Sequence, residues 1–374
     1  MKKIQVLKPV YRVDECLSEI RECLDSGWTG MGFKTIELED QWKAYTGLSY
    51  AHFLNSATSG LHLAIKVLKE KYNWKNTDEI ITTPFTFIST NHAIAYENLT
   101  LCFADIDDSL NLSPESVKKK INNNTKAIIF VGIGGNTKNL DEIVKIAKDN
   151  NLKIILDAAH MAGSRIDSQH VGFDVDVSVF SFQAVKNLPT ADGGMVCFSN
   201  EKDDKKAREL SWLGINKDTF SRSNLGSYKW NYTVNQVGYK YHGNSIMAAL
   251  GIVGLKYLDE DNQIRRELAS RYIKNLKGKV RYIAHESNQT SRHLFQIVVE
   301  DRDIVIESLT NNNIYPGVHY RQNNEYKPFQ TEEIFIKSKY YSDRVLSLPL
   351  HLELSLEDVD RICNVLLSDI VSND

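Results

Sequence analysis

The decisive stretch of this sequence is 177–198, which reads Val-Ser-Val-Phe-Ser-Phe-Gln-Ala-Val-Lys-Asn-Leu-Pro-Thr-Ala-Asp-Gly-Gly-Met-Val-Cys-Phe. It begins with an apolar run of strand length that ends in the hydroxyl of Ser181. Lys186 follows five residues later, and the pair Gly193 and Gly194 then opens a second apolar run. A lysine between two buried strands can be held against buried surface, although most lysines lie in solvent.

Similar apolar runs precede this stretch, and the segments between them are mostly helical in pattern. The runs of strand length lie at 78–84, 99–106, 126–132, 152–157 and 175–182. Because they are continuously apolar, they predict an α/β protein whose mainly parallel sheet is sandwiched by helices. Ligands of such sheets bind at the carboxyl ends of the strands.

The pattern changes in the last third of the chain. An apolar helix is expected over 244–258 and a charged stretch over 259–271, and short strands and helices follow them. We therefore predict a large α/β domain over 1–244 and a small C-terminal α+β domain over 245–374.

Composition excludes several classes of protein. The 374 residues include 45 Lys plus Arg and 48 Asp plus Glu, so the net charge of -3 predicts no nucleic-acid partner. The longest apolar run, Ile246–Leu255, is about half of the roughly 20 residues that a membrane helix needs. With no secretory signal at the start, these features predict a cytoplasmic protein without a membrane span. The five cysteines form no C-x-x-C pair, and the histidines are not spaced as a metal site.

Asp157 ends another fully apolar run, 154–157. A carboxylate at this position is equally suited to cap a helix or to face a cation at the edge of the sheet. Burial would lower the pKa of Lys186 and free its amine to condense with an aldehyde. A lysine Schiff base beside a strand-end carboxylate, which keeps a pyridine nitrogen protonated, is what pyridoxal phosphate requires. The two residues together therefore predict a site for this cofactor.

A phosphate group needs its own binding site. The stretch Asn55-Ser-Ala-Thr-Ser-Gly60 precedes a helix and offers hydroxyls, backbone amides and the positive end of the helix dipole. Ser181 is a second hydroxyl candidate, and Phe87 could stack on one face of a ring. Taken singly, the first stretch would be an ordinary helix cap and Phe87 a core aromatic.

These segments resemble the nucleotide-sugar aminotransferases of the DegT/StrS type, which are pyridoxal-phosphate enzymes of fold type I. The likeness covers nearly the whole chain. Its motifs lie at 26–30, 55–63, 78–87, 157–160, 181–194, 238–241, 248–251 and 346–351.

The resemblance implies a role for each matching residue. Lys186 would hold the cofactor covalently and move the proton, Asp157 would pair with the pyridine nitrogen, and His160 would contact the ring hydroxyl. Phe87 and Ala159 would lie on the two ring faces. The expected phosphate ligands are Thr58, Ser59, Ser181 and, from the other subunit of a homodimer, Lys240.

Substrates are expected by the same analogy. The resemblance implies transfer of the amino group of L-glutamate to a nucleotide-linked keto sugar, with a dTDP-4-keto-6-deoxyhexose preferred. Amination at C-3 and a pyridoxal-phosphate-binding regulatory protein without turnover are the alternatives. The expected substrate wall comprises Trp28, Thr29, His319 and Tyr320.

The chain also departs from its relatives. Many of them have Asn-Tyr-Arg where this sequence has Lys240-Tyr241-His242. The usual arginine near the donor carboxylate is therefore missing, and Arg321 or Arg222 could replace it. The glycine-rich turn 132–136 resembles a nicotinamide phosphate loop but lacks the full G-x-G-x-x-G pattern.

Overall fold

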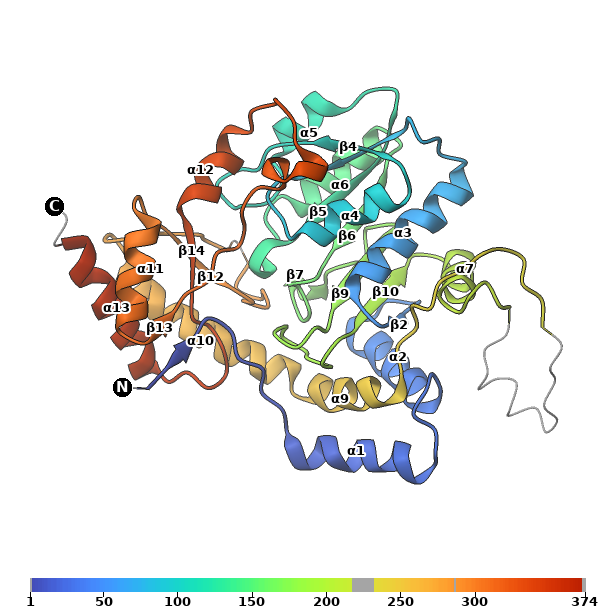
Figure 1. The fold of residues 1–374 in the computed structure, drawn as a ribbon, viewed down its shortest axis with the longest axis horizontal. Helices are drawn as coiled ribbons and strands as arrows, with labels where there is room; N and C mark the ends of the chain where they lie inside the picture. Colours follow the sequence, from blue (N-terminus) through green and yellow to red (C-terminus); the bar gives the residue numbers. More distant parts are fainter. Residues whose placement is uncertain (1, 217–231, 286, 372–374) are drawn as a thin grey trace.

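The computed structural model describes residues 2–216, 232–285 and 287–371. Its centre is a seven-stranded sheet in which all neighbouring pairs are parallel except those that β10 makes (Figure 1). In spatial order the strands are β2 (His52–Leu54), β10 (Gly194–Phe198), β9 (Val177–Ser181), β6 (Lys153–Asp157), β5 (Thr125–Val131), β3 (Glu79–Thr82) and β4 (Thr100–Phe103). The predicted α/β class with a mainly parallel sheet is confirmed.

Helices cover both faces of this sheet, and β5 shows why its strands are apolar throughout. Ile128 and Phe130 lie in the hydrophobic core on one face, whereas Ala127 and Ile129 lie in the core on the other. The first face is covered by α2 (Phe33–Thr46), α5 (Pro114–Lys120), α6 (Leu140–Asp149) and α9 (Ser245–Lys256). The second is covered by α3 (Ala57–Tyr72), α4 (Ile88–Tyr96) and α7 (Glu201–Ser211).

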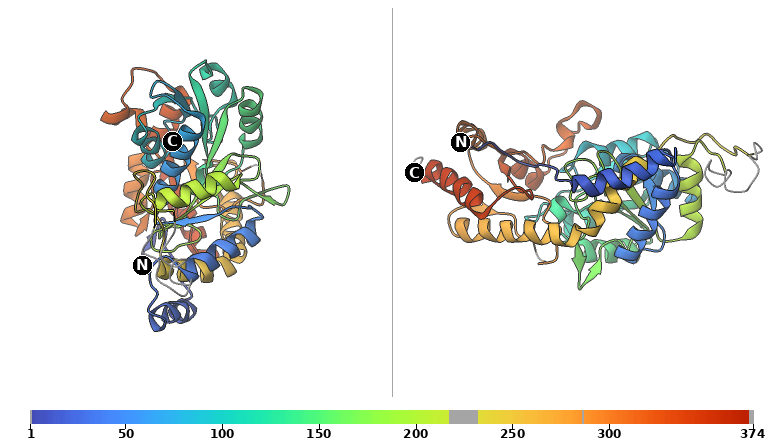
Figure 2. Two further views of the ribbon diagram at one scale, coloured as in Figure 1. Left: turned by 90° about the vertical axis from the view of Figure 1, so that its right-hand side faces the viewer. Right: turned by 90° about the horizontal axis from the view of Figure 1, so that it is seen from below.

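The C-terminal part forms a second, smaller sheet at the end of the molecule that holds both termini (Figures 1 and 2). Its antiparallel strands are β11 (Arg281–Tyr282), β12 (Phe295–Val298) and β14 (Val345–Leu348). They are accompanied by α10 (Leu258–Leu276), α11 (Arg302–Asn311), α12 (Ile336–Arg344) and α13 (Leu356–Val371). The remaining elements of the described residues are α1 (Val13–Asp25), the parallel pair β1 (Ile4–Gln5) and β13 (Ile314–Tyr315), the hairpin β7 (Arg165–Ile166) and β8 (Gln169–His170), and short 3-10 helices.

The packing crosses the predicted domain boundary at residue 245. Ala248 and Ile252 of α9 belong to the core of the seven-stranded sheet. Ile4, near the N-terminus, pairs with Ile314 and lies in the core of the C-terminal part. The division into 1–244 and 245–374 therefore stays a prediction.

Most elements agree with their sequence patterns, but the charged stretch 259–271 is part of the long helix α10. Among the elements that were not predicted from the sequence are β2, β14, α2, α7 and α12. β2 and β14 have few residues, so too little periodicity separates them from loops. None of the described helices is long and apolar enough to cross a membrane.

One contact brings the C-terminal part to the carboxyl edge of the main sheet. The backbone N–H of Asn323 donates to the carbonyl of Pro84 at 2.6 Å, directly after β3. The amide of Asn91 in α4 donates to Oδ1 of Asn323 at 2.7 Å. The segment before Asn323 is thereby fixed over the ends of the parallel strands.

Candidate active site

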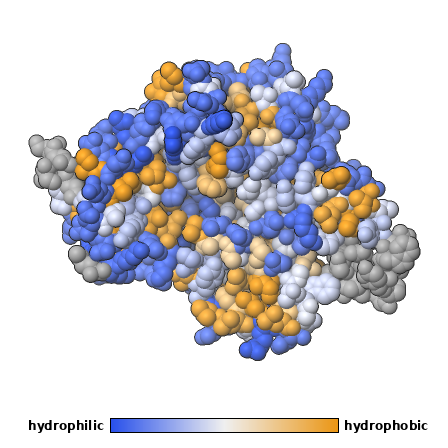
Figure 3. All heavy atoms as spheres, viewed as in Figure 1, coloured by the Kyte–Doolittle hydropathy of each residue, from blue (hydrophilic) through white to orange (hydrophobic). Residues whose placement is uncertain are grey.

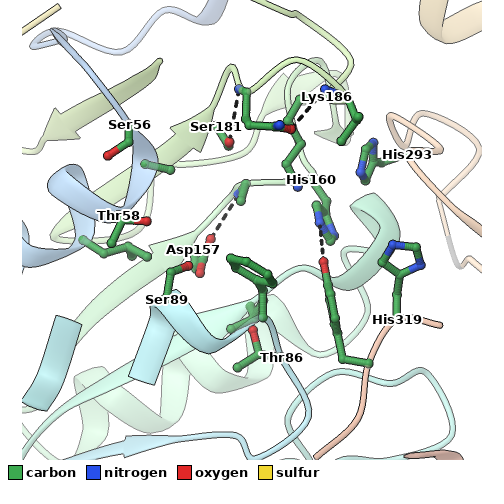
Figure 4. Close-up of a pocket in the computed structure, with 18 of the residues that line it drawn as sticks. Ser56, Thr58, Thr86, Ser89, Asp157, His160, Ser181, Lys186, His293 and His319 are labelled. Carbon is green, nitrogen blue, oxygen red and sulfur yellow. Dashed lines mark hydrogen bonds between the residues drawn. The ribbon is translucent and has the colours of Figure 1, made fainter. Parts of the chain in front are cut away.

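A cavity of about 430 Å³ lies at this carboxyl edge (Figure 4). Residues that follow β3, β6 and β9 line one part of it, together with the N-terminus of α3. His293, His319 and Tyr320, from the C-terminal part, line another. Segments far apart in the sequence therefore meet around one space.

Asp157 is buried at the end of β6 and faces the cavity. Its Oδ2 accepts a hydrogen bond from the hydroxyl of Thr90 at 2.8 Å, and its Oδ1 accepts one from the backbone N–H of Ala159 at 3.1 Å. No helix begins after it, so the alternative role as a helix cap is wrong. Burial raises the pKa of Asp157, and these two hydrogen bonds partly oppose the rise. A cation beside it in the cavity would stabilise the ionised form.

Lys186 lines the same cavity, in the turn between β9 and β10. Its backbone N–H donates to the carbonyl of Gln183 at 2.8 Å, which holds the turn (Figure 4). Burial lowers the pKa of Lys186 to about 8, although the carboxylate of Asp157 partly opposes this. Near neutral pH a useful fraction of the side chain is therefore an uncharged, nucleophilic amine.

The glycine-rich turn after β5 orients His160. Gly134 has a φ of 64°, which is accessible to glycine, and its N–H donates to Nδ1 of His160 at 3.1 Å. Burial lowers the pKa of His160 well below its usual value, and the electrostatic effects of Lys186 and His319 lower it further. The ring is therefore neutral, and its proton is on Nε2, which lies 3.2 Å from the hydroxyl of Tyr320. This turn thus serves a histidine and not a nicotinamide phosphate.

Hydroxyls and helix amides gather at the N-terminus of α3. Ser56 caps this helix, its Oγ accepting the N–H of Ser59 at 3.1 Å, and both Ser56 and Thr58 line the cavity. Ser181 lines it from the end of β9. Gly194 makes room here, because a Cβ at this position would lie 2.5 Å from the backbone nitrogen of Ala57. This arrangement suits a phosphate.

Aromatic side chains border the cavity from two directions. Phe87 lines it and is 57% exposed, so its ring is available to a ligand. The ring of Tyr320 lies 6.0 Å from that of Phe87 and stacks on His160 at 6.1 Å. Nδ1 of His319 lies 2.9 Å from the hydroxyl of Ser347, and burial lowers the pKa of His319 to about 4.

Several predicted residues do not line this cavity. The hydroxyl of Ser59 donates to Oδ1 of Asn55 at 2.6 Å, and Ser56 takes the place expected for it. Lys240 is exposed, with its Nζ 3.4 Å from the centre of the Trp212 ring. Nε1 of Trp28 donates to the carbonyl of Met31 at 2.8 Å. Thr29 is exposed and accepts from the N–H of Ser245 through its own carbonyl.

The described residues considered as partners for the carboxylate of the amino donor form hydrogen bonds with other residues of the chain. Nε of Arg321 donates to Glu325 at 2.7 Å. His242, which replaces the arginine of many relatives, has its Nδ1 2.7 Å from the carbonyl of Gly243. Arg222 lies outside the described residues. Among the described residues that line the cavity there is no arginine.

Several residues of this site were not predicted from the sequence, among them Thr90, Ser56 and His293. Thr90 contacts Asp157, and Ser56 and His293 line the cavity. The motif 55–60 contained Ser56, so its position as the helix cap could have identified it. Nothing local marks Thr90 or His293, because only the packing of α4 and of the segment before β12 brings them here.

The residues present fit pyridoxal phosphate. One cavity contains an amine with a lowered pKa, a buried carboxylate for a ring nitrogen, and a helix N-terminus with hydroxyls for a phosphate. Phe87 offers a ring face, and His160 offers an N–H donor. These are the requirements of the cofactor.

Comparison with known proteins gives the same answer. The DegT/DnrJ/EryC1/StrS aminotransferase family matches residues 11–367. The spore coat polysaccharide biosynthesis protein SpsC of Bacillus subtilis is 33% identical over 365 residues, which cover 93% of this chain and 92% of that protein.

Solved structures are similar over their full length. Helicobacter pylori PseC, an aminotransferase involved in the biosynthesis of pseudoaminic acid, superposes with a TM-score of 0.91 at 27% identity, covering 99% of this chain and 100% of that one. The putative sugar aminotransferase Spr1654 from Streptococcus pneumoniae, in its PMP form, gives 0.89 at 28% identity, with coverage of 98% and 99%. Spr1654 is also known in a PLP form. This chain therefore belongs to the DegT/DnrJ/EryC1/StrS family of sugar aminotransferases, and its cofactor is pyridoxal phosphate.

Proposed function

We propose that this enzyme transfers the amino group of L-glutamate to the keto sugar of a nucleotide diphosphate, with a dTDP-4-keto-6-deoxyhexose as its substrate. The observation that carries the proposal is the position of Lys186 and Asp157 in one cavity of a chain that matches the family over residues 11–367. Relatives named for polysaccharide and pseudoaminic acid biosynthesis support a sugar substrate.

Bound pyridoxal phosphate supplies an electron sink for the carbanion at the amine-bearing carbon. Lys186 provides the amine that holds the cofactor and then carries a proton on Nζ to or from that carbon. Its lowered pKa places this nitrogen near the pH at which it can both accept and release a proton. Asp157 keeps a negative charge beside the ring nitrogen.

The other residues bind and orient. His160 would donate a hydrogen bond from Nε2 to the ring hydroxyl oxygen, sharing this donor with the hydroxyl of Tyr320 that lies 3.2 Å away, and Phe87 and Ala159 would cover the ring faces. Ser56, Thr58 and Ser181 hold the phosphate at the N-terminus of α3. His319 and Tyr320 form the near part of the substrate wall. Because Trp28 and Thr29 do not line the cavity, we propose that they do not contact the substrate directly.

The enzyme acts as a homodimer in this proposal, with Lys240 reaching the phosphate of the neighbouring subunit. Val13, Leu17 and Leu24 of α1 are each more than half exposed, and Figure 3 shows an apolar patch at the edge of the molecule where α1 lies. A second subunit would remove this patch from water. The exposure of Lys240 leaves its ammonium available to that subunit.

Mixed dimers test the shared site. Subunits with Lys186→Ala are co-expressed with subunits with Lys240→Ala, each carrying its own affinity tag, and the mixed dimer is isolated. A shared site restores activity, because one of the two sites then has both lysines intact. A mixed dimer as inactive as both parents, or an enzyme that sediments as a monomer, contradicts this part of the proposal.

Product analysis tests the substrate. The purified enzyme is incubated with L-glutamate and a panel of dTDP- and UDP-linked 4-keto and 3-keto sugars, and the products are identified by mass spectrometry and NMR. We expect a 4-amino-4,6-dideoxyhexose on dTDP. A 3-amino product would replace the proposed regiochemistry. A cofactor spectrum that does not change on addition of glutamate would favour a binding protein without turnover.

A further inference from the structure

Two histidines face each other in the cavity, and their hydrogen bonds fix opposite tautomers. The ring centroids of His160 and His293 lie 4.4 Å apart, with an angle of 35° between the planes. His160 accepts a backbone N–H at Nδ1, so its Nε2 is a donor. The hydrogen bonds of His293 lead to the reverse assignment.

Asn187 determines the tautomer of His293. The side-chain nitrogen of Asn187 donates to the carbonyl of Ser291 at 2.8 Å, and a carbonyl can only accept. That nitrogen also donates to Oδ1 of Asn262 at 2.6 Å, and Asn262 is itself oriented by the carbonyl of Ala162 at 2.9 Å. Oδ1 of Asn187 therefore faces Nδ1 of His293, 2.8 Å away, and accepts a hydrogen bond from the N–H at this position.

The other nitrogen of His293 is left as an acceptor. Burial, with the positive charge of Lys186 and the neighbouring rings, lowers the pKa of His293 well below its usual value, so the ring is neutral. With its proton on Nδ1, its Nε2 carries a bare lone pair. This atom has no hydrogen-bond partner in the described part of the chain, and the residue lines the same cavity as Lys186 (Figure 4).

We propose that Asn187 is a positioning residue that holds His293 with its Nε2 lone pair toward the amines of the site, so that His293 accepts a hydrogen bond from Lys186 when that side chain is protonated and turns toward it, and from the ammonium group of the incoming amino donor. Because His293 is too weak a base to take the proton itself, it orients the amine and leaves the proton transfer to Lys186. The proposal rests on the proposed role of Lys186.

The relevant readout is the pKa of Lys186 in the full-length protein freed of cofactor. It is measured from the pH dependence of trace acetylation by acetic anhydride, quantified at Lys186 by mass spectrometry. The other ionisable groups that line the cavity with Lys186 are Asp157, His160, Asp192, His293, His319 and Tyr320. Each variant keeps all of them except the one that it substitutes.

His293→Phe keeps a ring but removes the lone pair. Since an acceptor stabilises the ammonium form, we expect the pKa of Lys186 to fall by roughly one to two units, the equivalent of one hydrogen bond to a charged group. The KM for glutamate should rise about tenfold, while the KM for the keto sugar stays unchanged.

Three further variants separate this role from packing. His293→Gln can place an amide oxygen near the position of Nε2 and should keep the pKa of Lys186 close to the parent value. Asn187→Leu frees the imidazole to move its proton to Nε2 and should lower that pKa. His351→Phe removes a buried histidine outside the cavity and is the matched control.

Unchanged pKa values of Lys186 in folded His293→Phe and Asn187→Leu proteins overturn the proposal. If circular dichroism shows that His293→Phe is unfolded, the comparison of His293→Gln with Asn187→Leu decides. A pKa of Lys186 that falls in Asn187→Leu but not in His293→Gln supports the proposal, and equal pKa values in the two variants overturn it. Borohydride reduction of the loaded enzyme and peptide mapping test the role of Lys186 separately, because a label on another lysine would remove that role without altering the measured pKa.

Discussion

The cavity has two walls that are built in different ways. The sheet-edge wall consists of Asp157, Ser181 and Lys186, which follow neighbouring strands of the parallel sheet. The C-terminal wall consists of His293, His319 and Tyr320, which come from a part of the chain with its own sheet and core. The first wall is a direct result of parallel strands ending at one edge. The second depends on particular contacts between distant segments.

This difference suggests a division of labour. The sheet-edge wall holds the ionisable groups that the cofactor chemistry needs, on strands that are buried on both faces. The C-terminal wall contributes neutral rings, since burial keeps the pKa values of its histidines low. Substitutions in the first wall should therefore abolish the chemistry, and those in the second should change its efficiency.

The largest effect is expected for Lys186→Ala. Loss of the amine should reduce turnover by at least about a thousandfold, because the residue acts both as the nucleophile for the cofactor and as the acid-base group. Steady-state rates with glutamate and the best keto sugar measure this loss. Lys153→Ala is the control, because Lys153 lies at the opposite end of the sheet beside Asp176. Near-normal turnover of Lys186→Ala would contradict the assigned role.

Asp157→Asn should come next. The amide keeps the shape but cannot supply the negative charge that holds a proton on the ring nitrogen, so we expect a loss of about a hundredfold or more in kcat. Asp176→Asn, at the amino end of the neighbouring strands, is the control. Equal rates for the two variants would show that the position at the carboxyl edge is not what matters.

Tyr320→Phe probes the C-terminal wall. It removes the hydroxyl that lies 3.2 Å from Nε2 of His160 but keeps the ring. One neutral hydrogen bond is worth about 0.5–1.5 kcal/mol, so kcat/KM should fall roughly two- to tenfold. A loss as large as that of Asp157→Asn would mean that the two walls do not differ in the way we describe.

The smallest effect concerns stability without cofactor. Burial lowers the pKa of Lys186 to about 8, so between pH 8 and the unfolded value of 10.5 the unfolded chain binds more protons than the folded one. Burial of Lys186 therefore destabilises the folded protein fully below about pH 8. The penalty becomes smaller as the pH rises from 8 to 10.5. Lys186→Met should stabilise the cofactor-free protein at pH 7 by about 1 kcal/mol after allowance for its partial exposure. Urea unfolding at pH 7 and pH 10 should show this gain shrinking at the higher pH.

The sequence by itself determined the fold class and the sheet-edge wall. Short, continuously apolar runs that alternate with helical segments are typical of strands buried on both faces, and the residues that end parallel strands meet at one edge. Asp157, Ser181, Lys186 and the helix start after Asn55 were therefore predictable from short stretches, each of which carries its own physical signal.

The tertiary structure alone decided which hydroxyls and rings complete the cavity. Ser59 turns to Asn55, so Ser56 takes the position at the cavity. Thr90 reaches Asp157 across the packed face of α4, and His293 is oriented through Asn187. Such contacts depend on side-chain directions within the packed core. Those directions follow from the way layers of the fold fit together, and no local pattern of residues encodes them.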